Sequence, residues 1–208
     1  MGLQADLDNV YHWVNDNNME LNGTKFEHLP IGKRRKFERF LTDTQELITK
    51  CQHVRDLGVY MSDKLDFQHH INNLVSKGIN MCNWILRTFT TRSTFPMSIL
   101  LKTLIYPVVE YASVVWSPNK KELIGLIETV QRKFTKQFDE FNTVDDQTGV
   151  RTCNANYWER LACLKLYSLE RRRERYQIFF LYKILRGAYP NPGLDLPNIQ
   201  VNPRGESK

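Results

Sequence analysis

The spacing of hydrophobic residues divides the N-terminal third of the chain into short segments. Apolar residues at helical spacing predict an amphipathic helix over residues 3–18. Apolar and polar residues then alternate on both sides of Asn22-Gly23, which predicts a hairpin over residues 19–29. Residues 52–61 predict a further short strand with a turn or bulge.

From residue 66 the apolar period changes to that of a helix. A long helix is expected over residues 67–89, begun by Ser62 or Asp63. Residues 97–116 predict a helix pair broken at Pro107, and Ser117-Pro118 is expected to start the next helix.

The C-terminal part predicts helices separated by polar loops. After a helix over 123–138, residues 142–156 are interpreted as a polar loop and residues 157–164 as a short helix. A longer helix over residues 168–186 is expected to end at Gly187. The last 21 residues hold four of the eight prolines and predict an extended or disordered tail.

Charge is distributed unevenly along the chain. The whole chain has a formal net charge of +6, and residues 160–187 alone carry eight basic against two acidic residues. Arginines interleaved with tyrosine and phenylalanine are typical of a nucleic-acid footprint, because guanidinium groups bind phosphate bidentately and aromatic rings stack on unpaired bases. A solvated helix face is the alternative interpretation. The candidate nucleic-acid-binding residues are Lys33, Arg34, Arg35, Lys36, Arg132, Lys133, Arg171, Arg172, Arg173 and Arg175.

No pattern in the sequence predicts catalysis or metal binding. Asp145-Asp146 is the only pair of adjacent aspartates, and it lies in a polar loop without a strand to fix its geometry. The four cysteines form no Cys-x-x-Cys pair. We therefore expect no catalytic residues, no metal site and no cofactor. No apolar run is long enough to span a bilayer, so an intracellular protein of the cytoplasm or nucleus is expected, with no membrane partner.

A series of short motifs, taken in order, is more specific than any one of them. It includes Leu3-Gln4-Ala5-Asp6-Leu7-Asp8, Asn18-Met19-Glu20-Leu21-Asn22, Arg55-Asp56-Leu57-Gly58-Val59, Phe67-Gln68-His69-His70-Ile71, Tyr106-Pro107-Val108-Val109-Glu110-Tyr111-Ala112-Ser113 and Ile127-Glu128-Thr129-Val130-Gln131-Arg132-Lys133-Phe134. Over residues 3–187 the chain resembles the C-terminal part of reverse transcriptases from non-LTR (LINE-type, jockey-like) retrotransposons.

The resemblance implies roles for particular residues. Asp56, Leu57, Gly58 and Val59 would form a primer-grip-like turn, and the helices after Phe67 would pack beside a template–primer duplex. The family's polymerase uses aspartates on two palm strands to hold magnesium. By resemblance this chain begins after both, so magnesium is expected only in the full-length family enzyme.

The expected fold is mainly α (α+β), a small palm remnant of hairpin and strands followed by a helical thumb-like bundle. The expected divisions are residues 1–62 (palm remnant), 63–140 (thumb-like helices), 141–187 (basic helical extension) and 188–208 (proline-rich tail).

The expected function is that of a truncated RNA-directed DNA polymerase, not an enzyme by itself, which binds RNA or DNA template–primer nonspecifically. One alternative is a helical interaction module whose arginines face an acidic protein partner. Another is a polymerase completed by other chains, which would supply the aspartates.

Overall fold

The computed structural model describes residues 2–32, 40–42, 46–144, 151–190 and 193. Within them the protein is mainly α with three small two-stranded sheets, which confirms the expected fold class. The chain forms two compact units, Met1–Asn72 and Asn73–Lys208. Residues 141–187 are not a separate extension, because their helices pack on helix α6 (Lys121–Thr135) of the second unit.

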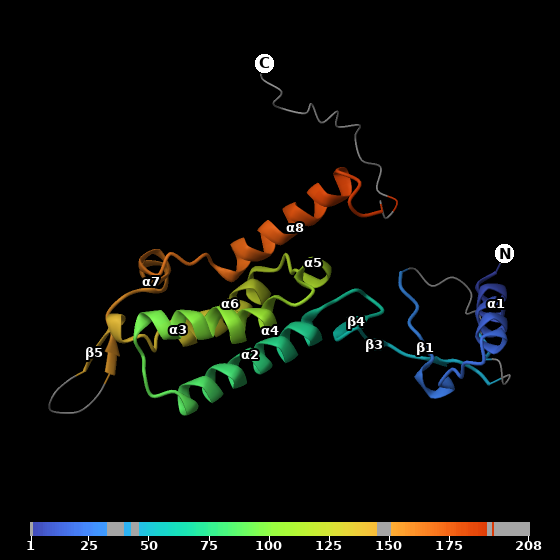
Figure 1. The fold of residues 1–208 in the computed structure, drawn as a ribbon, viewed down its shortest axis with the longest axis horizontal. Coiled ribbons are helices and arrows are strands. Elements are labelled where there is room, and N and C mark those ends of the chain that lie inside the picture. Colours follow the sequence, from blue (N-terminus) through green and yellow to red (C-terminus); the bar gives the residue numbers. More distant parts are fainter. Residues whose placement is uncertain (1, 33–39, 43–45, 145–150, 191–192, 194–208) are drawn as a thin grey trace, which may run out of the picture. The chain divides into compact units, whose positions relative to one another are not determined.

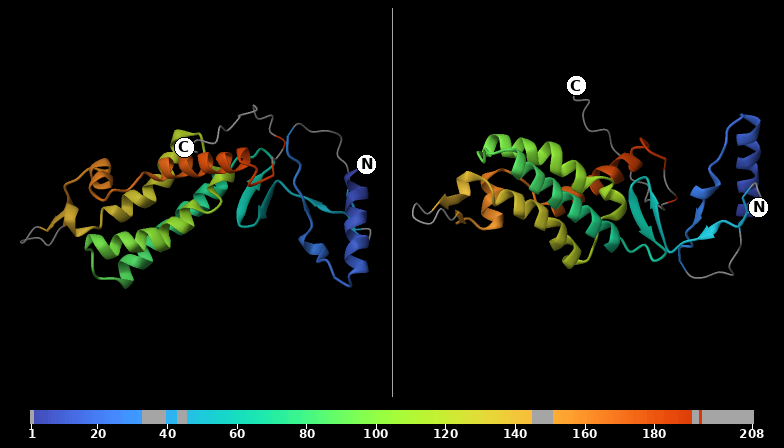
Figure 2. Two further views of the ribbon diagram at one scale, coloured as in Figure 1. Left: turned by 45° about the horizontal axis from the view of Figure 1, so that its top comes forward. Right: turned by 90° about the horizontal axis from the view of Figure 1, so that it is seen from below.

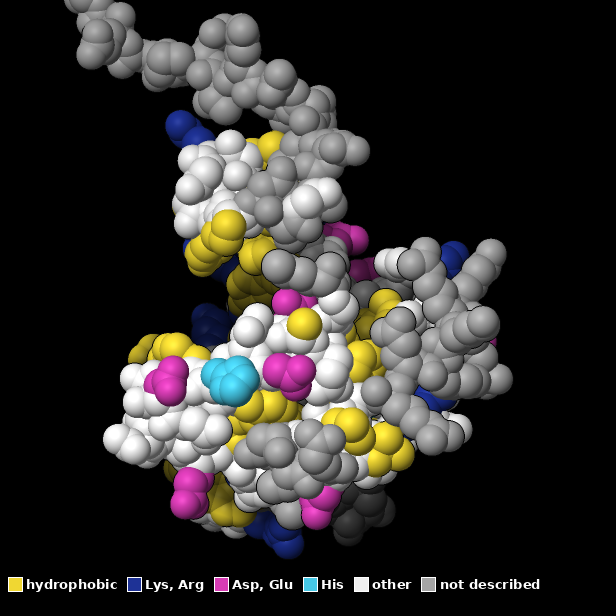
Figure 3. All heavy atoms as spheres, turned by 90° about the vertical axis from the view of Figure 1, so that its right-hand side faces the viewer, with side chains coloured by type: hydrophobic (Ala, Val, Ile, Leu, Met, Phe, Trp, Pro, Cys, Tyr) yellow, Lys and Arg dark blue, Asp and Glu magenta, His cyan; other side chains and the backbone are white. Residues whose placement is uncertain are grey.

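Helix α1 (Leu3–Asp16) of the first unit confirms the predicted amphipathic helix. Its buried positions are Tyr11 and Val14. The rest of its surface mixes acidic with apolar residues, and Figure 3 shows hydrophobic and acidic side chains next to each other on the face that carries α1. Its exposed apolar residues are Leu3, Val10 and Trp13.

The hairpin predicted over residues 19–29 does not form. The carbonyl of Asn22 accepts a hydrogen bond from the Lys25 N–H at 3.0 Å, within a 3-10 turn η1 (Gly23–Lys25). The chain then enters β1 (Glu27–His28), which pairs in parallel with β2 (Thr49–Lys50). The prediction is wrong because the partner of β1 is distant in sequence.

The turn predicted within residues 52–61 is present, but it joins two strands. β3 (His53–Asp56) and β4 (Val59–Ser62) form an antiparallel hairpin. Leu57 and Gly58 connect them with φ angles of +44° and +88°. Two consecutive left-handed residues are characteristic of the type I′ turn, whose twist matches that of the strands.

The second unit is built around three long helical segments. Helix α2 (Gln68–Thr88) starts at the end of the first unit and continues into the second. It is followed by α3 (Thr94–Leu100), a π-helical turn η2 (Leu101–Ile105), α4 (Tyr106–Glu110), α5 (Ser113–Trp116) and α6 (Lys121–Thr135). Figures 1 and 2 show α2, the α3–α4 segment and α6 lying side by side.

Gly78 lets these helices approach closely. A Cβ atom at Gly78 would lie 2.9 Å from Val109 Cγ1 of α4 and 3.0 Å from Val130 Cγ1 of α6. Such distances are shorter than van der Waals contact, so α2 requires a residue without a side chain at this crossing. Trp116, Phe134 and Phe138 are fully buried in the same core.

The helix pair over residues 97–116 is not broken at Pro107. The π-helical turn η2 precedes Pro107, which lies in the first turn of α4, where a residue without an N–H is tolerated. The break comes later, at Ala112, whose φ is +52°. Two predicted helix starts also differ from the structure. Just before α2 it is Asp66, and not Ser62 or Asp63, whose side-chain Oδ1 accepts a hydrogen bond from the Gln68 N–H, at 2.9 Å. Helix α6 starts after Lys120 and not at Ser117.

The remaining elements follow α6. A 3-10 turn η3 (Asp139–Phe141) leads into the antiparallel pair β5 (Asn142–Val144) and β6 (Arg151–Cys153). The prediction of an irregular loop over residues 142–156 is therefore wrong at these two strands. Asp145-Asp146 lies outside the described residues. α7 (Tyr157–Cys163) and α8 (Leu169–Leu185) confirm the last two predicted helices.

Candidate nucleic-acid interface

Helix α8 carries four of the ten predicted basic residues, and its ends are defined by local sequence. Ser168 Oγ accepts a hydrogen bond from Arg171 N at 3.2 Å, which caps the first turn. Gly187, with a φ of +69°, ends the helix in the left-handed conformation. The inner face, marked by buried Leu169, Arg173 and Ile184, packs toward α5 and α6.

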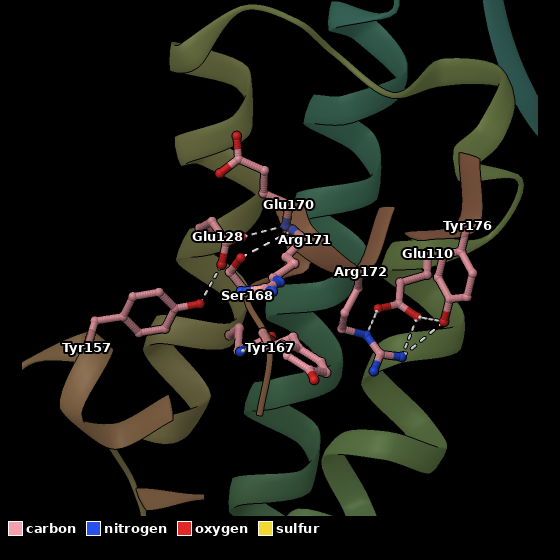
Figure 4. Close-up of polar contacts among 10 residues, drawn as sticks. Glu110, Glu128, Tyr157, Tyr167, Ser168, Glu170, Arg171, Arg172 and Tyr176 are labelled. Carbon is pink, nitrogen blue, oxygen red and sulfur yellow. Dashed lines mark hydrogen bonds and ion pairs between the residues drawn. The ribbon is translucent and has the colours of Figure 1, made fainter. Parts of the chain in front are cut away.

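Arg172 is held by an ion pair. Its Nε donates to Glu110 Oε1, its Nη2 donates to Glu110 Oε2 at 2.9 Å, and the Tyr176 hydroxyl donates to the same Oε2 at 2.9 Å (Figure 4). The guanidinium also lies 4.1 Å from the ring centroid of Tyr106. The hydrogen bonds to Glu110 raise the pKa of Arg172 above its usual range. Arg172 therefore connects α8 to α4 and is only partly exposed.

Arg173 lies inside the protein. Only 2% of it is exposed, and burial lowers the pKa of its guanidinium. Its Nε and Nη1 make no hydrogen bond within the part of the chain that the structure describes. Of the four arginines of α8 predicted to bind nucleic acid, two are therefore not free to do so, because the helix turns Arg173 into the core and pairs Arg172 with Glu110.

Glu128 anchors the beginning of α8 from within α6. This buried carboxylate accepts hydrogen bonds from the Tyr157 hydroxyl of α7 and, at 2.8 Å, from the Glu170 N–H in the first turn of α8 (Figure 4). A negative charge is favourable at a helix N-terminus. Burial and the neighbouring Glu128 raise the pKa of Tyr157 well above its usual range.

Arg171 and Arg175 differ from their two neighbours because both are exposed. Their guanidinium carbons each lie 5.2 Å from the ring centroid of Tyr167, within the range of a cation–π interaction. Neither arginine makes an ion pair with any residue that the structure describes. Two cations beside one exposed ring are thus available to an anionic ligand.

The same pattern continues toward the C-terminus of α8. Arg175 also lies 6.0 Å from the ring centroid of Phe179, and Arg186 lies 5.4 Å from that of Tyr182. From Arg171 to Arg186 these residues are spaced by four, four, three and four positions, so they share one face of the helix, and Tyr167 lies just before its N-cap. We call this exposed set the Arg–aromatic stripe: Tyr167, Arg171, Arg175, Phe179, Tyr182 and Arg186.

The other predicted basic residues are placed differently. Arg132 of α6 is exposed, with its guanidinium 4.8 Å from the ring centroid of Tyr157. Lys133 Nζ donates to Asn83 Oδ1 of α2 at 2.8 Å, which favours a role in packing. Lys33, Arg34, Arg35 and Lys36 lie outside the described residues.

The primer-grip-like residues form the tip of the β3–β4 hairpin in the first unit. Asp56 and Val59 are opposite each other, with Leu57 and Gly58 in the turn between them. Val59 is buried and Leu57 is exposed. Their suggested contact with a primer stays a prediction.

Sequence reasoning missed the residues that fix α8 in place. Glu110 and Glu128 are single acidic residues within apolar runs of helical segments. An isolated carboxylate in such a run was the only feature of the sequence that could have indicated a buried polar contact. The C-terminal half of the stripe was missed as well, although the helical spacing from Arg171 to Arg186 is present in the sequence.

No group of three or more metal-ligating side chains occurs among the described residues. None of the described helices is both long and apolar enough to cross a membrane.

Comparison with known proteins gives one relative. No protein-family model matches the chain, and no solved structure matches it. The chain is 27% identical over 139 residues to the uncharacterized protein B0403.1 of Caenorhabditis elegans. The match covers 67% of this chain and 66% of the relative, just under two thirds of the relative's length.

Proposed function

We propose that this chain binds nucleic acid without sequence preference through the Arg–aromatic stripe. The observation that carries the proposal is the pair Arg171 and Arg175, whose guanidinium carbons each lie 5.2 Å from the ring centroid of exposed Tyr167 and which make no ion pair with a described carboxylate. Guanidinium groups without a protein partner bind phosphate oxygens by paired hydrogen bonds. The proposal agrees with the resemblance to a reverse-transcriptase thumb, whose helices lie beside nucleic acid.

The placement of the arginines sets the size of the expected electrostatic effect. Each phosphate contact contributes about 0.7 to 0.9 to the slope of log affinity against log salt concentration. Since Arg172 is paired and Arg173 is buried, only Arg171 and Arg175 of this group contribute. Removing both contacts should therefore reduce the slope by roughly 1.4 to 1.8.

The proposal is tested with the double variant Arg171→Glu/Arg175→Glu of the full chain. Fluorescence anisotropy with a labelled 20-nucleotide strand should show affinity lowered by about tenfold or more, together with the flatter salt dependence. The control is Lys120→Glu/Lys121→Glu, which changes the total charge equally at exposed positions where α6 begins.

The control variant should lower affinity far less than the stripe variant. Equal losses in both would mean that total charge, and not the stripe, governs binding. If the stripe variant binds as well as the unchanged chain, the proposal fails, and an acidic protein segment becomes the better candidate partner for these arginines.

A further inference from the structure

The C-terminal half of the stripe exposes aromatic rings to solvent. Phe179 is 54% exposed and Tyr182 is 50% exposed, although large apolar side chains are usually covered. Each ring has a guanidinium beside it, Arg175 at 6.0 Å and Arg186 at 5.4 Å from the ring centroids. Arg186 Nε also donates to the Tyr182 hydroxyl at 2.8 Å, which keeps the cation next to the ring.

The stripe combines three rings with three cations: Tyr167, then Arg171 and Arg175, then Phe179 and Tyr182, then Arg186. From Arg171 to Arg186 the helix rises by about 22 Å, at about 1.5 Å per residue. A single nucleic-acid strand presents complementary groups, because it carries negatively charged phosphates for the arginines and flat bases for the rings. In a duplex the faces of the bases are stacked on each other, so exposed rings have nothing to stack on.

We propose that the Arg–aromatic stripe selects unpaired nucleic acid, with bases stacked on Phe179 and Tyr182 and phosphates on the neighbouring arginines. This inference rests on the proposed function and adds the class of ligand. Phe179 is the central residue, because it follows the Tyr167–Arg175 cluster and is itself next to a cavity.

That cavity supplies a second place for a base. It has a volume of about 520 Å³ and lies where α8 meets α4, α5 and the residues between them. Five rings contribute to its lining: Tyr111, Tyr176, Phe179, Phe180 and Tyr189. Lys183, also in the lining, donates to the Tyr189 hydroxyl at 3.4 Å. Only a strand without a pairing partner can turn a base into such a cavity without losing base pairs.

Three probes of equal length separate stacking from charge. They are a labelled 20-nucleotide oligo(dT), a 20-base-pair duplex and a 20-unit abasic deoxyribose-phosphate strand, each titrated into the full chain. The oligo(dT) should bind about tenfold or more tighter than the other two, because stacking contributes strongly for each base bound.

The variant Phe179→Leu/Tyr182→Leu keeps apolar side chains but removes the rings. It should weaken binding of oligo(dT) by about tenfold and leave the abasic strand, the duplex and the salt slope unchanged. Both residues are exposed, so thermal unfolding should stay the same. Phe95→Leu is the matched control, because Phe95 is a 78% exposed phenylalanine on α3, and this variant should bind oligo(dT) normally.

The possible failures can be told apart. Equal affinity for oligo(dT) and duplex, or equal effects of the leucine variant on oligo(dT) and abasic strand, would overturn the selection of unpaired strands. The proposed function would survive that result if binding still depended on Arg171 and Arg175. No binding to any of the three probes would overturn both proposals.

Discussion

Arg172 of α8 and Glu110 of α4 form a two-point ion pair that fixes the angular position of α8. The Nε and Nη2 groups of Arg172 donate to the two carboxylate oxygens of Glu110, which is 62 residues earlier in the chain. With Arg172 turned toward α4, the positions one before and three after it, Arg171 and Arg175, lie on the outer face. The ion pair therefore decides which arginines of the basic segment can reach a ligand.

Removing either partner of this pair should destabilise the second unit. We expect Arg172→Met and Glu110→Gln each to lower the free energy of unfolding by about 2 kcal/mol, because the remaining partner is left without its hydrogen bonds in a largely covered position. A urea double-mutant cycle should give a coupling energy of about 1 to 3 kcal/mol. Additive single effects would show that the two side chains do not interact in solution.

Gly78 and Gly125 should respond to alanine in opposite directions. At Gly78 the added methyl group would lie 2.9 Å from Val109 Cγ1, so overpacking should lower the free energy of unfolding by about 1 to 3 kcal/mol. At Gly125 of α6 no atom lies within 4 Å of the same position. Gly125→Ala should raise stability by about 0.5 to 1 kcal/mol through helix propensity. Thermal unfolding measures both, and a neutral Gly78→Ala would contradict the close crossing of the helices.

The buried thiol of Cys82 should make stability fall at alkaline pH. Burial raises its pKa from 9.0 to about 12, so the unfolded chain loses this proton at a lower pH than the folded protein. The free energy of unfolding should therefore decrease between pH 9 and pH 12, by up to about 1.4 kcal/mol per pH unit.

Cys82→Ala should remove that part of the decrease. The comparison is made by urea unfolding in reducing buffer at several pH values, with Cys163→Ala, an exposed cysteine, as the control. Tyr106 and Tyr157 contribute equally in all three proteins, so the difference isolates Cys82. Identical pH dependence of the Cys82 variant and the unchanged chain would refute a buried neutral thiol.

The first unit should open more readily than the helices of the second. Its strands are two to four residues long and form only two-stranded sheets, which are marginal in water. Hydrogen exchange followed by mass spectrometry should show faster exchange in residues 3–61 than in α6. Similar protection of both regions would count against this order of stability.

Features set by nearby residues could be predicted from the sequence. α7 begins with a capping box in which Asn156 and Glu159 satisfy each other's backbone groups, and α8 runs from the cap Ser168 to Gly187. These signals lie within a few positions of the helix ends they determine.

Features set by distant residues could not be predicted. The parallel pairing of β1 with β2 depends on the chain between them, and therefore the Asn22-Gly23 turn did not produce a hairpin. The inward position of Arg173 and the pairing of Arg172 depend on Glu128 and Glu110, which approach only when α8 packs on the bundle. The basic run in the sequence thus predicted more cations available to a ligand than the structure exposes.

The position of the bound strand is measured most directly by ultraviolet cross-linking of the full chain to oligo(dT), followed by mass spectrometry of the peptides. We expect cross-links to concentrate in the peptides that contain Tyr167, Phe179 and Tyr182, and to disappear in Arg171→Glu/Arg175→Glu. Cross-links confined to other helices, or unchanged in that variant, would contradict binding through the Arg–aromatic stripe.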